Sequence, residues 1–278
     1  AMPRNSRVAA IQMASSPNVS ANLLEARRLI QEAVDESGAN LVVLPENFAF
    51  MGDQDRDLLD LREAEGRGPL QDFLAEMASR HRIWLVGGTV PLNATHPDRV
   101  RAACLVFNDR GERVARYDKI HLFDVKLLET GECYEESATI EPGDASVVLD
   151  TPFGRLGLAV CYDLRFPELY REMLDAGMEI MALPACFTAI TGKAHWEVLV
   201  RARAIENLCY VVAAAQGGYH RNGRRTHGHS MVVDPWGSVL AQVPRGAGHV
   251  CCPLDQEYLH SVRLNFPALD HRRLTCRV

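Results

Sequence analysis

The sequence predicts an α/β protein in which two mixed β-sheets pack on each other and helices cover their outer faces. Three observations support this prediction. Short apolar runs alternate with amphipathic helical patterns along the chain. Three hairpin signals interrupt that alternation, so parallel and antiparallel strand pairs must be mixed. The expected total of about ten to twelve strands is too large for one open sheet, and a second sheet relieves this.

The first third of the chain follows the order strand, helix, strand, helix, strand. Ser20 can cap the first helix, whose apolar positions fall on one face, and Gly38 is placed to end it. The flanking strands are short apolar runs of the kind that becomes buried. The expected strands are 7–13, 40–45 and 83–90, and the second helix is expected at 69–80.

The remainder of the chain adds the hairpins and two further helices. Each hairpin is predicted by a turn rich in Gly, Pro, Asn and Asp between two apolar runs. The turns are expected at 108–111, 151–154 and 234–237, between strands that include 102–108, 146–150, 155–160 and the two arms of 229–243. Helices are expected at 167–176 and 194–207, and further strands at 179–183, 209–215 and 248–254.

Composition excludes several classes of function. The chain has 278 residues, 47% of them hydrophobic and 24% charged, which is ordinary for a globular protein in water. A formal net charge of -6 without a basic stripe argues against a nucleic-acid partner. No apolar run approaches the roughly 18 residues of a membrane span. Linkers and repeats are also absent, so we expect one domain over 1–278, with a core at about 7–270 and a tail at 271–278.

The cysteines favour a reducing compartment. None of them forms a C-x-x-C pair, and several lie inside apolar runs, where cysteine behaves as a small hydrophobe. No apolar stretch follows the first residues, so we expect no secretory signal and a cytoplasmic location. The eight positions are 104, 133, 161, 186, 209, 251, 252 and 276.

Three polar residues stand where strands end, which is where reactive groups collect in layered α/β folds. Glu46 follows the run 40–45, Lys119 follows a hairpin, and Cys161 lies between a strand and the start of a helix. Amide groups there, together with a nearby cation, can lower a thiol pKa and hold an oxyanion. Local spacing alone leaves the alternatives open: a structural cysteine, a solvated glutamate and a surface lysine.

Taken together, these residues lie in motifs that resemble the nitrilase, or carbon–nitrogen hydrolase, superfamily. The motifs are Leu44-Pro45-Glu46, 117–123 (Tyr-Asp-Lys-Ile-His-Leu-Phe) and 160–169 (Val-Cys-Tyr-Asp-Leu-Arg-Phe-Pro-Glu-Leu), in the order found in the family. The resemblance implies an αββα sandwich and a catalytic triad without metal or organic cofactor. It implies that Cys161 attacks an amide carbonyl to form a thioester and that Glu46 is the general base.

The same resemblance implies roles for supporting residues. Lys119 and the backbone N–H of Tyr162 would stabilise the oxyanion. Glu136 matches a second glutamate of the family's pockets and would orient Lys119 or the substrate, with an ordinary surface position as the alternative.

Segments 187–197, 201–207 and 228–237 resemble the Nit branch of the superfamily, apart from Lys193, where proline is expected. This implies a hydrolase of linear amides that cleaves deaminated glutathione into α-ketoglutarate and cysteinylglycine. Alternatives are α-ketoglutaramate, another small amide, carbamoyl or nitrile substrate, or an inactive scaffold protein. Arg165 is placed to bind a substrate carboxylate, with a structural ion pair as its alternative, and Thr188 can add a hydrogen bond.

The remaining features concern partners and metals. Helices such as 194–207 often form subunit contacts in the family, which implies a homodimer or larger assembly, and no nucleic acid or membrane. Trp196 on that helix is expected in the core or in an interface. The spacing of His220, His227 and His229 fits no standard metal site, so no metal is expected. The basic loop 219–225 has no predicted role.

Overall fold

Two β-sheets packed face to face form the centre of the structure, a computed structural model that describes residues 6–275. The first sheet has the order β17-β1-β2-β3-β5-β4, and β6 also pairs with β5. Within it β1, β2 and β3 run parallel, whereas β17, β4 and β6 are antiparallel to their neighbours. The strands are β1 (Arg7–Gln12), β2 (Leu41–Val43), β3 (Trp84–Val86), β4 (Val90–Asn93), β5 (Val100–Phe107), β6 (Arg113–Asp118) and β17 (Gly248–Pro253).

The second sheet is also mixed, as the hairpin signals predict. Its order is β16-β15-β12-β11-β10-β9, with β10, β11 and β12 parallel and the outer strands antiparallel. The predicted hairpins at 151–154 and 234–237 join β9 to β10 and β15 to β16. The strands are β9 (Val148–Thr151), β10 (Gly154–Leu158), β11 (Ile180–Ala185), β12 (Tyr210–Ala215), β15 (Ser230–Val233) and β16 (Val239–Val243).

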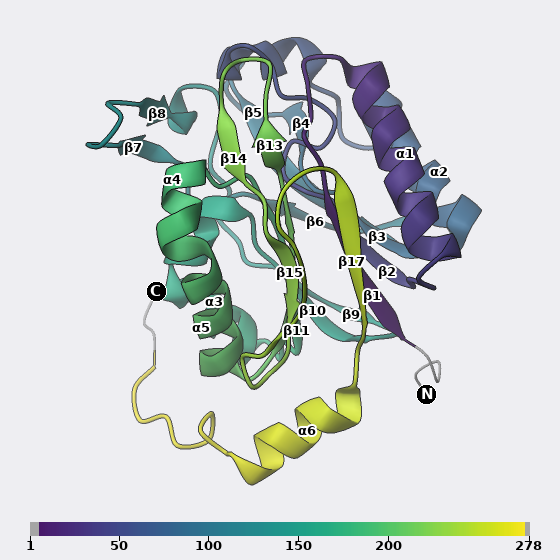
Figure 1. Cartoon of the computed structure of the whole chain (residues 1–278), viewed down its shortest axis with the longest axis vertical. Helices are drawn as coiled ribbons and strands as arrows, with labels where there is room; N and C mark the ends of the chain where they lie inside the picture. The colour runs from purple at the N-terminus through teal and green to yellow at the C-terminus, as the bar shows by residue number, and fades with distance from the viewer. Residues whose placement is uncertain (1–5, 276–278) are drawn as a thin grey trace.

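Helices cover both outer faces and complete the predicted four-layer αββα sandwich (Figure 1). On the first sheet α1 (Val19–Asp35) packs beside α2 (Pro69–His81), and both contact its strands. On the second sheet α5 (Glu197–Asn207) contacts β12 and β15, with α3 (Pro167–Asp175) beside it. The amphipathic helices thus bury their apolar faces on the sheets, which is the main source of their stability in a protein.

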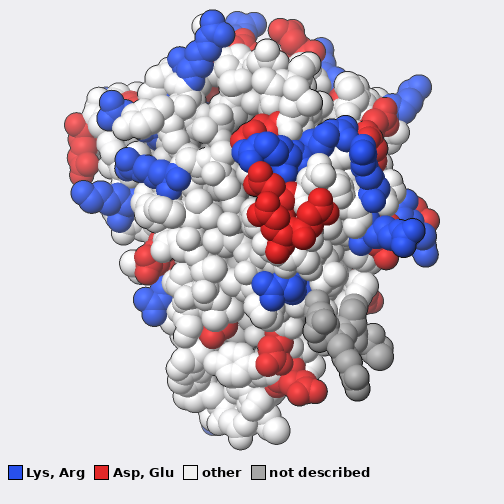
Figure 2. All heavy atoms as spheres, turned by 45° about the vertical axis from the view of Figure 1, so that its right-hand side comes forward, with Lys and Arg blue, Asp and Glu red and all other residues white. Residues whose placement is uncertain are grey.

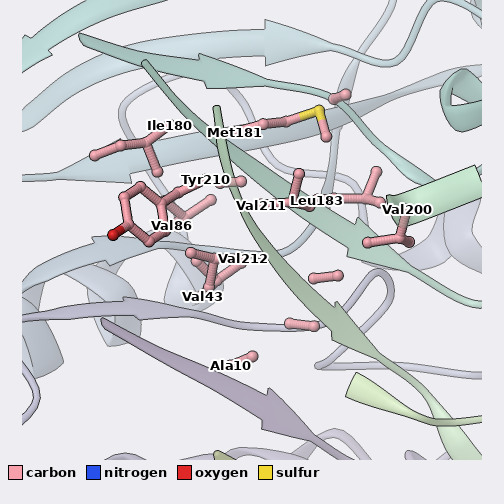
Figure 3. Packing of buried hydrophobic residues seen from close by; sticks show 14 of the residues in the cluster. Ala10, Val43, Val86, Ile180, Met181, Leu183, Val200, Tyr210, Val211 and Val212 are labelled. Atoms are coloured by element: carbon pink, nitrogen blue, oxygen red, sulfur yellow. The ribbon is translucent and has the colours of Figure 1, made fainter. Parts of the chain in front are cut away.

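The space between the sheets is filled by small and branched side chains. Val43 and Val86 from the first sheet meet Val212 and Tyr210 from the second in one buried cluster (Figure 3). Alternate residues of the second sheet point the other way, where Val211 packs near Val200 of α5. Burial on both faces explains why these strands read as continuous apolar runs.

Several boundaries differ from the sequence prediction. Helix α1 begins at Val19 because Asn18, and not Ser20, caps it: Asn18 Oδ1 accepts a hydrogen bond from the Ala21 amide at 3.0 Å. The predicted strand 83–90 divides into β3 and β4 because Gly88 turns the chain at φ +57 beside the Pro45 carbonyl.

The predicted helix 194–207 starts earlier, with α4 (Ala189–Thr191) and a π-helical turn, Gly192–Trp196, leading into α5. Helix α6 (Gln256–Asn265) was not predicted, since Leu259 is its one fully buried residue and no apolar stripe marks it.

Short elements surround the ends of the central strands. Hairpins β7–β8 and β13–β14 were not predicted, because their strands have three residues each and little apolar character. The bounds are β7 (Asp124–Lys126), β8 (Cys133–Glu135), β13 (Gly217–Tyr219), β14 (Arg225–His227) and the 3₁₀ turns η1 (Asp55–Leu61), η2 (Glu136–Ala138) and η3 (Cys161–Arg165).

Surface charges of both signs are interspersed. Figure 2 shows acidic and basic side chains mixed on one face of the molecule, without a continuous basic stripe on that face. On α1, for example, Arg28 forms ion pairs with both Glu25 and Glu32. In residues 6–275 no helix is both long enough and apolar enough to span a membrane.

Candidate active site

The structure brings Glu46, Lys119 and Cys161 to one pocket. Glu46 follows β2 of the first sheet, Lys119 follows β6, and Cys161 follows β10 of the second sheet. The pocket therefore lies where strand ends of both sheets meet, and its empty volume including the open mouth is about 830 Å³. Glu136 of η2 also lines it.

Lys119 is held between two carboxylates. Its Nζ lies 2.8 Å from Glu46 Oε1 and 2.8 Å from Glu136 Oε1, and 1% of its side chain is exposed. Burial disfavours the ammonium, yet the charges of Glu136 and Glu46 raise the pKa of Lys119 well above its ordinary value. Lys119 is therefore a fixed positive charge. Burial also raises the pKa of Glu136, against the lowering effect of Lys119.

Cys161 occupies a strained turn that presents its thiol to the pocket. It has φ +48, a left-handed conformation that is uncommon for a residue with a side chain, and it begins η3. The Cys186 amide donates a hydrogen bond to Cys161 Sγ at 3.4 Å. Burial and the neighbouring Glu46 raise the pKa of Cys161 well above its usual value, and Lys119 only partly opposes them. The expectation of a lowered thiol pKa was therefore wrong, because it ignored the burial of the turn.

Asp163 clamps this turn, and the sequence reasoning assigned it no role. The side chain is fully buried, and its Oδ2 accepts hydrogen bonds from the Val160 amide at 2.9 Å and the Tyr117 hydroxyl at 2.6 Å. Its Oδ1 accepts from the His121 amide at 3.0 Å and lies 2.8 Å from His121 Nδ1. The residue before Cys161 is thus tied to the segment that carries Lys119. Its place in the motif 160–169 was the available signal.

A second buried polar residue supports the Glu46 loop. Gln216 follows β12, and its Nε2 donates hydrogen bonds to the carbonyl of Glu46 at 3.1 Å and to Ser15 Oγ at 2.8 Å. Its Oε1 accepts from the Ser15 amide at 3.0 Å. The Asn47 amide donates to Thr89 Oγ1 at 2.9 Å. The backbone on both sides of the carboxylate is therefore fixed by buried hydrogen bonds.

This pocket combines a thiol, a buried carboxylate base and a fixed cation, which suits acyl transfer through a cysteine. Residues 7–263 match the model of the carbon–nitrogen hydrolase family. The chain belongs to the carbon–nitrogen hydrolase family.

Relatives of this hydrolase include named proteins and proteins of known structure. The deaminated glutathione amidase of Yersinia enterocolitica is 42% identical, over 97% of this chain and 94% of that protein. The structure of Saccharomyces cerevisiae Nit3, a member of branch 10 of the nitrilase superfamily, superimposes with a TM-score of 0.88 at 32% identity and 98% coverage of both chains. An amidase from Nesterenkonia, solved as a mutant with acrylamide added at its active site cysteine, has a TM-score of 0.78 and 27% identity, over 94% of this chain and 98% of that one.

The predicted substrate residues of this hydrolase all line the same pocket. The guanidinium of Arg165 lies over the rings of Phe187 and Tyr162, and its Nη1 is 3.2 Å from His195 Nδ1. No carboxylate within residues 6–275 forms a salt bridge with Arg165, so the alternative of a structural ion pair has no support there. Thr188 caps α4 and bonds Thr191, while its side chain stays beside the pocket.

The basic loop, which had no predicted role, contributes to the pocket of this hydrolase. Arg224 lines the pocket with Asp55 and Tyr134, none of which the sequence analysis selected. The available signal was the basic character of the loop, but nothing in the sequence shows which arginine turns inward.

The three histidines are placed as loop and strand residues. His220 is buried and bonds the Ser15 carbonyl and Thr226 Oγ1, while His227 stacks on His229. Trp196 is fully buried, as expected for a core residue, and donates to the carbonyl of His229.

Proposed function

We propose that the chain hydrolyses the amide bond of deaminated glutathione, releasing α-ketoglutarate and cysteinylglycine. The observation that carries the proposal is the cluster of Glu46, Lys119 and Cys161, all buried, with the half-buried Glu136 on one pocket. The names of its relatives support the choice of substrate, and the family supports amide hydrolysis.

In the first half-reaction Cys161 Sγ attacks the amide carbonyl while Glu46 takes the thiol proton. Transfer concerted with attack suits a thiol whose pKa is raised, because little thiolate exists before substrate binds. The carbonyl oxygen becomes an oxyanion that Lys119 and the Tyr162 amide stabilise. Glu46 then returns the proton to the leaving nitrogen, the carbon–nitrogen bond breaks, and the amine departs from the thioester.

In the second half-reaction water enters the place left by the amine. Glu46 removes a proton from this water, which attacks the thioester carbonyl, and the same two donors hold the second oxyanion. Collapse of the intermediate breaks the carbon–sulfur bond, and the proton held by Glu46 restores the Cys161 thiol. Glu136 keeps Lys119 in position throughout, through the contact of 2.8 Å.

We assign the acyl end of the substrate to Arg165 and Thr188. The α-ketoglutaryl group ends in a carboxylate beside a keto oxygen, and a guanidinium binds such a carboxylate in a bidentate manner. Arg165 has no carboxylate partner within residues 6–275 and lies four residues from Cys161. The Thr188 hydroxyl can donate to the keto oxygen once substrate displaces its contact with Thr191.

Steady-state kinetics test this function directly. We expect a higher kcat/KM for deaminated glutathione than for α-ketoglutaramate, and intact-mass spectrometry should detect an α-ketoglutaryl adduct on the enzyme. The C161A variant should keep its fold and lose both the adduct and hydrolysis. A strong preference for α-ketoglutaramate would refute the proposed substrate, and hydrolysis by C161A would refute the mechanism.

We further propose that the enzyme is a homodimer, or a larger homo-oligomer built from such dimers, in a reducing, cytoplasmic compartment. Every cysteine within residues 6–275 is free, which supports the compartment. An exposed apolar face supports the dimer: Trp236 stacks edge-on against Phe266 at 5.3 Å, and Ile205 of α5 lies beside Gly237 of the same turn. Light scattering on W236E should show a monomer if this face joins the two copies, and an unchanged mass would refute the assignment.

A further inference from the structure

Arg224 differs from the other arginines of its loop because it enters the pocket. It immediately precedes β14 and is half-buried, whereas Arg221 and Arg225 are exposed. Its guanidinium lies over the Tyr134 ring at 5.2 Å. Its backbone amide donates a hydrogen bond to Asn222 Oδ1 at 2.9 Å, which fixes the turn that carries it.

A second, smaller cavity lies next to Arg224. It has about 250 Å³ of empty volume and shares Asn47, Asp55, Leu58 and Arg224 with the main pocket. Asn222 closes one side, where its Nδ2 donates to the Gly52 carbonyl at 2.8 Å. The two cavities therefore adjoin at Arg224 and the three other residues that line both. A substrate whose leaving group is ammonia has no use for the smaller cavity.

The charge of Arg224 is only loosely compensated. Its one salt bridge within residues 6–275 is with Asp55, at 3.7 Å, and half of the Asp55 side chain is exposed. Arg101 also lines the main pocket but pairs tightly with Glu141 at 2.7 Å. A guanidinium has five N–H donors, so Arg224 keeps capacity for an incoming carboxylate, whereas the charge of Arg101 is already closely paired with a carboxylate.

Arg165 and Arg224 occupy different parts of the wall. The contacts of Arg165 are Tyr162, Phe187 and His195, and those of Arg224 are Asp55 and Tyr134, with no residue in common. Two separate cations with spare donors match a substrate that carries a carboxylate at each end.

We propose that Arg224 and the second cavity form a leaving-group subsite for an amine that carries a carboxylate, such as the C-terminus of a dipeptide. This subsite rests on the proposed function and explains how one acyl group can be released from a dipeptide in preference to ammonia. The carboxylate of the leaving group binds the Arg224 guanidinium, and the residue beside the scissile amide occupies the space next to Asn47 and Leu58.

A cycle of enzyme and substrate changes tests the subsite. Three substrates are compared: deaminated glutathione, its C-terminal carboxamide, and α-ketoglutaramate. Replacing the terminal carboxylate by the carboxamide should lower kcat/KM of the unchanged enzyme by on the order of 10- to 100-fold, mainly through KM. R224Q should lower kcat/KM for the free acid by a similar factor and should hardly distinguish the acid from the carboxamide. For α-ketoglutaramate, the decrease in kcat/KM caused by R224Q should be at least about tenfold smaller. R224K should recover part of the preference for the acid.

R221Q is the matched control, since it removes one positive charge from the same loop outside the pocket. It should retain the preference for the acid over the carboxamide. If R224Q lowers kcat/KM equally for all three substrates, or still prefers the acid as the unchanged enzyme does, the subsite is refuted while the proposed function stands. If the unchanged enzyme fails to hydrolyse deaminated glutathione, the proposed function is refuted, and the subsite with it.

Discussion

Asp163 offers the sharpest test of how the fold positions the proposed nucleophile. In D163N one oxygen becomes an NH₂ group, which cannot accept a hydrogen bond. In either orientation of the side-chain amide, this NH₂ group faces a backbone N–H, that of Val160 or that of His121, which can only donate a hydrogen bond. One of the four contacts is thus lost outright at a fully buried site, whereas the Tyr117 hydroxyl or His121 Nδ1 on the same side can turn to accept from the new NH₂ group. At about 1.5–3 kcal/mol for a hydrogen bond to a charged group, the free energy of unfolding should fall by about 1.5–3 kcal/mol.

Activity should fall as well, because the Val160–Asp163 contact holds the turn in which Cys161 has φ +48. We expect kcat for amide hydrolysis to drop at least about tenfold, since displacement of a reacting group by about 1 Å can cost 100-fold. Urea denaturation gives the stability, and steady-state kinetics give kcat. Y117F removes one of the same contacts and should cost about 1.5–3 kcal/mol. A D163N protein within about 1 kcal/mol of the unchanged stability, with unchanged kcat, would refute the clamp.

Three other predictions concern charge near the pocket and in the β13–β14 region. Burial is the largest cause of the raised pKa of Cys161, and the charge of Glu46 is the second. E46Q removes that charge, so alkylation of Cys161 by iodoacetamide at pH 8 should become faster, while the rate of amide hydrolysis should fall by about 100-fold or more. Slower alkylation would contradict this. R165Q should raise KM for deaminated glutathione and α-ketoglutaramate alike by about 10-fold or more, because both share the acyl end; an effect on one substrate alone would count against the assignment. Burial, and to a smaller extent the charges of His229 and Arg245, lower the pKa of His227 from 6.5 to about 4. As the pH falls, His227 is therefore protonated in the unfolded chain before it is protonated in the folded protein. Stability should therefore be lost as pH falls from about 6.5 toward 4, and urea midpoints of H227Q should depend less on pH over that range.

The layers of the fold were predictable because they depend on local patterns. Alternating apolar runs and amphipathic helices indicated the two sheets and the helices that cover them, and the turn residues at 108–111, 151–154 and 234–237 located three hairpins correctly. Elements without an apolar stripe were missed, as with α6, where Leu259 alone is fully buried. That the chain forms one domain stays a prediction.

The site was less accessible, because its residues meet across long stretches of chain. Lys119 contacts Glu46 from 73 residues away and Glu136 from 17 residues away, and no local spacing encodes either contact. The resemblance to a family predicted that these residues lie together, whereas their positions at strand ends did not. Neither the strand-end positions nor the family resemblance predicted that Arg224 lines the pocket. The orientation of its side chain depends on the loop contact between Asn222 and the Gly52 carbonyl, 170 residues earlier in the chain. The raised pKa of Cys161 was missed for the same reason: burial is a property of the assembled sheets.

The arrangement of charges explains how these buried side chains can carry out the proposed chemistry. With both carboxylates ionised, Glu46, Glu136 and Lys119 bear a net charge of about -1, and a third anion beside them would be costly at a buried position. Burial and the neighbouring Glu46 accordingly raise the pKa of Cys161, which favours the neutral thiol before substrate binds. When Glu46 accepts the thiol proton, its own negative charge disappears as the oxyanion forms, so the total is unchanged. The Lys119 ammonium then faces the new oxyanion in place of the Glu46 carboxylate, and its contact with Glu136 holds it in position. The buried lysine can therefore stabilise the transition state without moving and without exchanging a proton.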